Sequence, residues 1–186
     1  MKFERIEKIH EGRFISFYNA IYRTATGKQK IYEMISRDRN IRSIDDLRKD
    51  KCDAVVLIIQ TPDHTKILLN REFRMAVGTE AVNFPAGLID SGETCEIAAA
   101  RELREETGLT LTSIEDVLPM SYSGVGLTNE RNCCVIGTAE GTFAPSTSDE
   151  EEIQAAWYTK DQVKELLKGN LFAARTQAFC YMWANS

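Results

Sequence analysis

Apolar and polar residues alternate in short stretches through the first quarter of the chain, which is the period of a β-strand. Residues 14–22 carry aromatic and aliphatic side chains in this alternation, and a second short stretch follows. The Thr26-Gly27 dipeptide between them is a turn signal, so an antiparallel pair of strands is predicted within residues 1–50. The charge-dense stretch 37–51 is expected to be a connector.

The rest of the chain mixes strand and helix patterns. Residues 54–59 form a β-branched apolar run, typical of a buried strand. Residues 93–107 have a helical composition, with Thr94 suited to the N-cap and Gly108 to a left-handed stop. Further strands are predicted at 66–73, 117–122, 133–138 and 153–158, and further helices at 160–167 and 172–183. This order predicts an α/β domain with a mixed sheet and helices on both faces.

Composition narrows the class of protein. The 186 residues, 43% hydrophobic and 27% charged, suit one compact globular domain. The longest apolar run is far shorter than the ~20 residues that span a bilayer, and the N-terminus lacks a signal-peptide core. We therefore expect a cytoplasmic protein without a membrane partner. The net charge of −5 disfavours broad binding to nucleic acid.

The cysteine pattern suggests no metal centre. The five cysteines are odd in number and contain no C-x-x-C pair, and the two histidines are far apart in the sequence. A zinc site therefore has no sequence support. We expect reduced thiols, as in a cytoplasmic protein. The cysteines are Cys52, Cys95, Cys133, Cys134 and Cys180.

Three carboxylates are crowded together near the end of the predicted helix. Glu102 and Glu106 are four residues apart and Glu105 is three from Glu102, so they share one edge of the helix. Like charges at this spacing destabilise an isolated helix by about 0.2–0.5 kcal/mol per pair, and the helix dipole opposes them here. Arg101 and Arg104 can pair with some of this charge. Divalent cations, Mg²⁺ or Mn²⁺, are the natural partners of the remainder.

A solvated acidic helix face would be the ordinary interpretation of such a cluster. The wider pattern, however, is G-x5-E-x7-R-E-U-x-E-E-x-G-U, where U is a bulky aliphatic residue. A chance match of this kind is on the order of 10⁻⁸ per chain of this length. The stretch resembles the Nudix box without a departure. The matching residues are Gly87, Glu93, Arg101, Glu102, Leu103, Glu105, Glu106, Gly108 and Leu109.

The resemblance implies an α/β/α sandwich that hydrolyses a nucleoside diphosphate linked to another moiety, with divalent metal. It implies that Glu102, Glu105 and Glu106 bind the metal. Arg101 would orient a carboxylate, with Glu93 as its partner or as a further ligand, and we count Arg101 and Glu105 as catalytic. Gly87 would let the backbone turn, so that the Ala86 carbonyl faces a metal.

The flanking sequence is similar to the ADP-ribose and nucleoside-diphosphate-sugar branch of that family, through residues 84–93 and 70–74. The branch implies that Arg74 contacts the substrate phosphates. It also implies a homodimer in which residues 1–50 exchange strands and help to bind the nucleoside, while residues 51–186 form the hydrolase domain. Phe14, Phe17 and Tyr18 are candidates to stack on the base, with packing in the core or in the dimer as the alternative. In the loop 121–130, Gly126 and Glu130 are candidate substrate contacts.

The general base should come from outside the metal cluster. The acidic run 149–152 lies where this branch carries a mobile loop with the base. A carboxylate near other carboxylates has a raised proton affinity, which helps it to accept a proton from water. We predict Glu151 as the base, with Glu150 as the second choice. A solvated charge run is the alternative.

Two positions leave the substrate open. Enzymes that act on ADP-ribose tend to have proline where this chain has Val125, and the branch often has glutamate where it has Asn83. A dinucleotide or coenzyme A is therefore an alternative substrate. A non-catalytic sensor of nucleotide sugars is a third possibility, but the box is undamaged and no DNA-binding element is evident.

Overall fold

The computed structural model describes residues 1–148 and 151–186. The chain forms two compact units. Unit 1 comprises Met1–Asp53 and Met120–Asn132, and unit 2 comprises Ala54–Pro119 and Cys133–Ser186. Among the described residues, no helix is long and apolar enough to cross a membrane.

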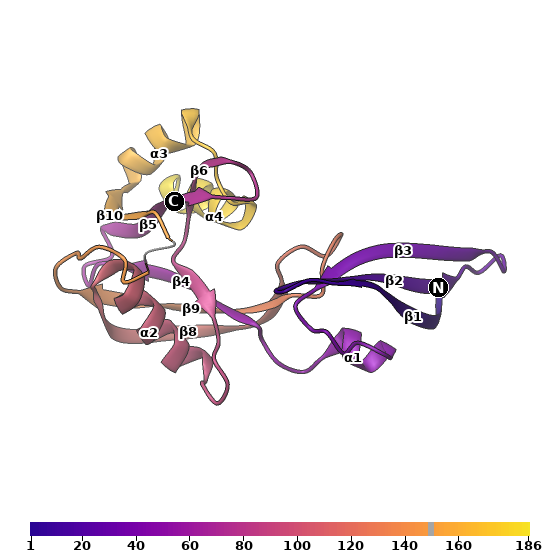
Figure 1. The fold of residues 1–186 in the computed structure, drawn as a ribbon. Helices are drawn as coiled ribbons and strands as arrows, with labels where there is room; N and C mark the ends of the chain where they lie inside the picture. The colour runs from indigo at the N-terminus through magenta and orange to yellow at the C-terminus, as the bar shows by residue number, and fades with distance from the viewer. Residues whose placement is uncertain (149–150) are drawn as a thin grey trace. The chain divides into compact units, whose positions relative to one another are not determined.

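Unit 1 contains a three-stranded antiparallel sheet in the order β1-β2-β3 (Figure 1). Its strands are β1 (Lys2–Glu11), β2 (Ser16–Arg23) and β3 (Gln29–Ser36). The turn between β2 and β3 contains Gly27 at φ 80°, which confirms the predicted hairpin. One face of the sheet buries Tyr18, Ala20 and Met34. The predicted connector contains a short helix, α1 (Ile44–Arg48).

Unit 2 is built on a mixed sheet in the order β10-β5-β4-β9-β8, with β6 paired to β5 and β7 paired to β4. All five strands predicted from residue 54 onwards are present, and β6 and β7 were not predicted. β8 begins earlier than predicted. Its first residues are largely polar and exposed, so no apolar pattern in the sequence marked the start of the strand. The strands are β4 (Ala54–Gln60), β5 (Lys66–Arg74), β6 (Thr79–Asn83), β7 (Ala86–Leu88), β8 (Thr110–Tyr122), β9 (Arg131–Glu140) and β10 (Ile153–Thr159).

Helices cover both faces of this sheet, as predicted. Figure 1 shows α2 (Cys95–Thr107) on one side, where it packs on β4 and β7. On the other side, α3 (Lys160–Gly169) and α4 (Ala174–Ala184) pack against alternate residues of β4 and β5. This explains why residues 54–59 are apolar without alternation: both faces of β4 are buried.

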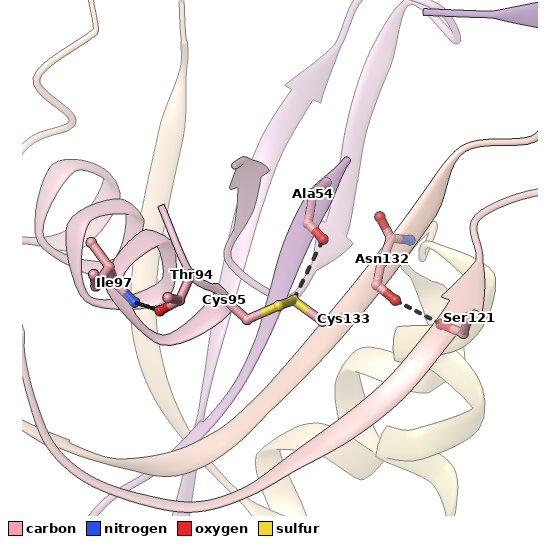
Figure 2. The surroundings of a disulfide bond; sticks show 7 residues. All are labelled: Ala54, Thr94, Cys95, Ile97, Ser121, Asn132 and Cys133. Carbon is pink, nitrogen blue, oxygen red and sulfur yellow. Dashed lines mark hydrogen bonds between the residues drawn. A yellow bond between two sulfur atoms is a disulfide. The ribbon is translucent and has the colours of Figure 1, made fainter. Parts of the chain in front are cut away.

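One expectation from the cysteine pattern is wrong. Cys95 and Cys133 form a disulfide, with their Cα atoms 6.5 Å apart (Figure 2). Their sequence separation of 38 residues gave no sign of the pairing. The fold brings them together by placing the start of α2 beside β9. Cys52, Cys134 and Cys180 are free thiols, as expected.

Candidate active site

The helix α2 carries the crowded carboxylates and is capped as predicted. The Thr94 hydroxyl accepts a hydrogen bond from the Ile97 N–H at 3.3 Å. Gly108 ends the helix in the left-handed conformation at φ 77°. The caps fix where the helix begins and ends, and therefore which way each glutamate points.

Arg101 joins the carboxylates at the exposed edge of α2. Its Nε and Nη2 donate to both oxygens of Glu93, at 2.9 and 2.7 Å. Its Nη1 donates to Glu102 at 2.8 Å and to Glu105 at 3.1 Å. The Arg101 hydrogen bond lowers the pKa of Glu93 to about 2. Arg101 therefore orients three carboxylates, and Glu93 reaches it from the loop before the helix.

Glu106 lies in a different environment, on the side of α2 that faces the sheet. It is only 6% exposed, and Asn70 on β5 donates to its Oε2 at 2.7 Å. The Ala86 N–H approaches its Oε1 at 3.4 Å. Burial, together with the charge of Glu102, raises the pKa of Glu106 to about 8. Without further positive charge, this carboxyl group holds its proton at neutral pH.

Glu102 lies between these two environments. Burial raises its pKa first of all, and the negative charges of Glu105 and Glu151 raise it further, against the opposing effect of Arg101. A Cβ at position 87 would lie 1.9 Å from the Glu102 Cδ, so only glycine leaves room for this carboxylate. Gly87 is not among the glycines with positive φ. The structure therefore shows that position 87 needs space beside its Cα, while the predicted backbone turn at Gly87 stays a prediction.

The residues around Glu102 and Glu106 fit a divalent cation. These two carboxyl groups lie close enough for the charge of Glu102 to raise the proton affinity of Glu106, and they supply hard oxygen ligands, which suit Mg²⁺ or Mn²⁺. The buried Asn70 Oδ1 has no hydrogen-bond partner within the described part of the chain. Buried polar atoms are rarely left without a partner, so this oxygen is consistent with a ligand or a metal-bound water nearby. The predicted role of the Ala86 carbonyl stays a prediction.

A second part of the site lies at the end of β5. A cavity of about 400 Å³ is bordered by Arg74, Glu72 and Glu151, among other residues of unit 2. Arg74 forms an ion pair with Glu72. The structure thus places the predicted phosphate contact and the predicted base on one cavity, with Glu151 close enough to Glu102 to affect its pKa. The second-choice base, Glu150, lies outside the described residues.

The remaining predicted contacts belong to unit 1. Glu130 accepts from Arg37 and from the Ser123 hydroxyl, both at 2.8 Å. The Gly126 carbonyl accepts from the Tyr32 hydroxyl at 2.6 Å. Phe14 is 68% exposed, with the Arg13 guanidinium 5.0 Å from its ring centroid.

Unit 1 also contains a cavity of about 410 Å³ with mainly apolar walls. Asn129 lines it and is only 6% exposed, and neither polar atom of its amide has a partner among the described residues. Aromatic side chains and an amide with open hydrogen-bonding positions suit a flat, polar-edged ring. The aromatic lining residues are Tyr22, Tyr32 and Tyr122.

Sequence reasoning missed Asn70 and Glu72 as members of the site. Both lie in the segment that resembles the ADP-ribose branch, and together with Arg74 they occupy alternate positions at the end of β5. Asn70 is buried in an otherwise apolar stretch, and a buried polar residue in a strand is itself a signal. Asn83, by contrast, has a structural contact: its Oδ1 accepts from Thr176 on α4 at 3.0 Å.

Comparison with known proteins identifies the arrangement. The family model of the NUDIX domain matches residues 51–178. The chain belongs to the Nudix family. This match confirms the family that the box suggested. In the structure the box residues form α2 and the loop that precedes it.

Relatives of this Nudix chain include pyrophosphatases. An ADP-sugar pyrophosphatase of Mus musculus is 32% identical over 74% of this chain and 61% of its own length. An ADP-ribose pyrophosphatase of Saccharomyces cerevisiae is 30% identical over 70% of this chain and 54% of its own. An uncharacterized Nudix hydrolase of Schizosaccharomyces pombe is 27% identical over 91% of this chain and 80% of its own. This chain therefore spans little more than half the length of the two named enzymes.

The fold is shared with a solved structure over the whole chain. A crystal structure of an ADP compounds hydrolase has a TM-score of 0.75 and covers 100% of this chain and 93% of its own. At 18% identity this likeness shows the fold, including the N-terminal strands. The Nudix assignment and the mixed α/β architecture thus agree with the expectations from the sequence.

Proposed function

We propose that this Nudix chain hydrolyses the pyrophosphate bond of a nucleoside diphosphate sugar, with ADP-ribose as the first candidate, in a reaction that requires Mg²⁺ or Mn²⁺. The observation that carries the proposal is the pair Glu102 and Glu106. Both are largely buried and repel each other, and Arg101 contacts only the first of them. The named relatives support the substrate class.

The residues that would hold the cation are Glu102, Glu105 and Glu106. When bound, it would neutralise charge on the pyrophosphate and activate a water molecule. The protein's own part is to preorganise the ligands: Arg101 holds Glu102 and Glu105, and Asn70 holds Glu106. Positioning and electrostatics supply most of the catalysis in phosphoryl transfer, so no nucleophilic side chain is needed.

Glu151 is the proposed general base. It accepts a proton from the water whose oxygen bonds to phosphorus, while the bridging P–O bond breaks. Arg74 shares a cavity with Glu151 and would bind the substrate phosphates by releasing its ion pair with Glu72. The products are a nucleoside monophosphate and a sugar phosphate.

Unit 1 is the proposed binding region for the nucleoside. Its apolar cavity has aromatic walls and the Asn129 amide, which has no hydrogen-bond partner among the described residues; these suit a nucleobase edge better than exposed Phe14 does. We extend the proposal to a homodimer assembled through residues 1–50. Gel filtration with light scattering tests the dimer, and a chain lacking these residues that still dimerises would contradict it.

The activity is tested by phosphate release in the presence of phosphatase. The substrates are ADP-ribose, GDP-mannose, UDP-glucose, a dinucleoside polyphosphate, NADH and coenzyme A, each with Mg²⁺ and then with Mn²⁺. Turnover of a sugar compound that needs the metal supports the proposal. Turnover of only the dinucleotide or coenzyme A would show that the substrate is one of these compounds and not a nucleotide sugar. Tight binding without turnover of any compound favours a sensor.

A further inference from the structure

The disulfide is attached to the helix that carries the metal-binding carboxylates. Cys95 is the first residue of α2 and is partly exposed, whereas Cys133 on β9 is only 3% exposed. Figure 2 shows the bond joining the start of the helix to the sheet, with the Cys133 Sγ 3.8 Å from the Ala54 carbonyl oxygen of β4. The start of α2 is thus tied covalently to β9, at a point where β9 lies beside β4.

A short chain of contacts leads from this bond to the carboxylates. Glu93 lies two residues before Cys95 and forms a two-point ion pair with Arg101. Arg101 in turn holds Glu102 and Glu105. The loop between β7 and α2 is otherwise largely exposed. The disulfide therefore restrains the segment from which Glu93 reaches the arginine that orients two metal-binding carboxylates.

We propose that the Cys95–Cys133 disulfide is a redox-modification site for a dithiol reductant, and that its reduction weakens the binding of a divalent cation by α2. A thiolate of the reductant attacks the more exposed Cys95 sulfur and forms a mixed disulfide, while Cys133 leaves as a thiolate and takes up a proton. The second thiol of the reductant then releases Cys95. Two protein thiols and one oxidised dithiol result, with two electrons transferred.

Two of the free cysteines, Cys134 and Cys180, leave this bond undisturbed. Burial raises the pKa of Cys134, and raises that of Cys180 to about 12, so neither is a thiolate at neutral pH. Only thiolates attack disulfides. Cys134 also follows Cys133 directly on β9, so their side chains point to opposite faces of the sheet. Control of the bond therefore rests with external dithiols rather than with these two thiols.

The proposal rests on the metal site of the proposed function, and its test reads metal binding directly. Full-length protein is prepared oxidised, and in parallel is reduced with dithiothreitol and freed of it under argon. Mn²⁺ affinity is then measured for both by electron paramagnetic resonance. We expect the dissociation constant to rise about fivefold or more on reduction, the lower end of coupling between two sites. Cys95→Ser should reproduce the reduced value and not respond to dithiothreitol, whereas Cys134→Ser, which removes a thiol on the opposite face of β9, should behave as wild type.

Linkage gives a second measurement that needs no variant. If oxidation favours the metal fivefold, saturating Mg²⁺ must favour the disulfide fivefold, which lowers its reduction potential by about 21 mV. A redox titration of wild-type protein with and without Mg²⁺ checks this, with mass spectrometry to follow the Cys95–Cys133 link. It remains informative even if Cys95→Ser does not fold.

The possible outcomes distinguish a failure of the proposed redox control from a failure of the proposed metal site. Equal Mn²⁺ affinity in both states would overturn the switch alone, even if reduction lowers the melting temperature, because the bond would then be only structural. Resistance of the bond to dithiothreitol in native protein would overturn it as well. No Mn²⁺ binding in either state would overturn the metal site and the switch with it.

Discussion

Two carboxylates associated with α2 have opposite electrostatic environments. Glu93, in the loop before the helix, pairs with Arg101, and its pKa falls to about 2. Glu106, near the other end, is buried beside Asn70, and its pKa rises to about 8. Charge is thus neutralised by an arginine at one end, whereas at the other end burial keeps the carboxyl group protonated near neutral pH. The comparison shows why a cluster of glutamates alone does not reveal which of them binds metal.

The largest effect should come from removing the charge at the buried end. Glu106→Gln keeps the shape and the oxygen that accepts from Asn70, but removes a metal-binding charge. We expect kcat to fall by at least about 100-fold, because losing a residue that merely supports a metal ligand already costs up to about 100-fold. Steady-state kinetics with Mg²⁺ measures it. Glu165→Gln, which removes an exposed carboxylate on α3, is the matched control. Turnover like that of the wild type would contradict the assignment of Glu106 to the metal site.

Removing the pairing at the exposed end should have the next largest effect. Arg101→Met leaves Glu93, Glu102 and Glu105 without their shared cation. Losing a residue that holds the metal-binding carboxylates in place costs about 10–100-fold in metal affinity or activity. Calorimetric titration with Mn²⁺ measures the affinity, and Arg104→Met on the same helix is the control. If both variants bind Mn²⁺ equally well, Arg101 is not a positioning residue.

A smaller effect is expected at Asn70, which supports the buried end alone. Asn70→Leu removes the donor to Glu106 and should weaken Mn²⁺ binding by about tenfold. Because Asn70 does not contact Glu102 or Glu105 in the described hydrogen bonds, the loss should be smaller than for Arg101→Met. Calorimetry on both variants under the same conditions makes the comparison. A larger loss at Asn70 would reverse the assignment of roles.

The smallest effect is a pH dependence with opposite signs at the two ends. The lowered pKa of Glu93 contributes stability that is present above about pH 4.5 and is lost as the pH falls towards 2. The raised pKa of Glu106 acts in the other direction, so metal-free protein loses stability as the pH rises from about 4.5 to 8. Thermal unfolding in EDTA, measured from about pH 2 to about pH 8, checks both pH dependences. In Glu106→Gln the loss of stability between about pH 4.5 and 8 should disappear, while the loss at lower pH should remain.

The same raised pKa makes metal binding proton-linked. A cation that binds the Glu106 carboxylate near pH 7 must displace its proton, so binding should release about one proton and tighten as the pH approaches 8. Calorimetry in buffers of different ionisation enthalpy counts the proton. Release that persists in Glu106→Gln would place the linked group elsewhere.

The sequence revealed the parts of the fold that depend on local signals. The helix α2 was predictable because Thr94 and Gly108 mark its ends, and the central strands because they are continuously apolar. β1 was not separately predicted because most of its residues are exposed, so no buried face marks it. The carboxylates could be found from their spacing, since three of them share one helix edge.

Other parts of the site depend on tertiary contacts. Asn70 meets Glu106 across 36 positions of sequence, and Cys95 meets Cys133 across 38. Neither pair has a spacing rule that would reveal it. The division of labour between Glu93 and Glu106 likewise depends on which is buried, because burial and pairing shift a pKa in opposite directions.

The Glu102 carboxylate occupies the space where a Cβ at position 87 would lie, which predicts how this position responds to substitution. At Gly27, where only the positive φ matters and the space beside the Cα is open, asparagine should be accepted. At Gly87 every residue with a Cβ should be rejected, alanine included, because the clash is with the carboxylate itself. In a saturation screen for activity, codon 87 should therefore be depleted of all replacements, whereas codon 27 keeps some.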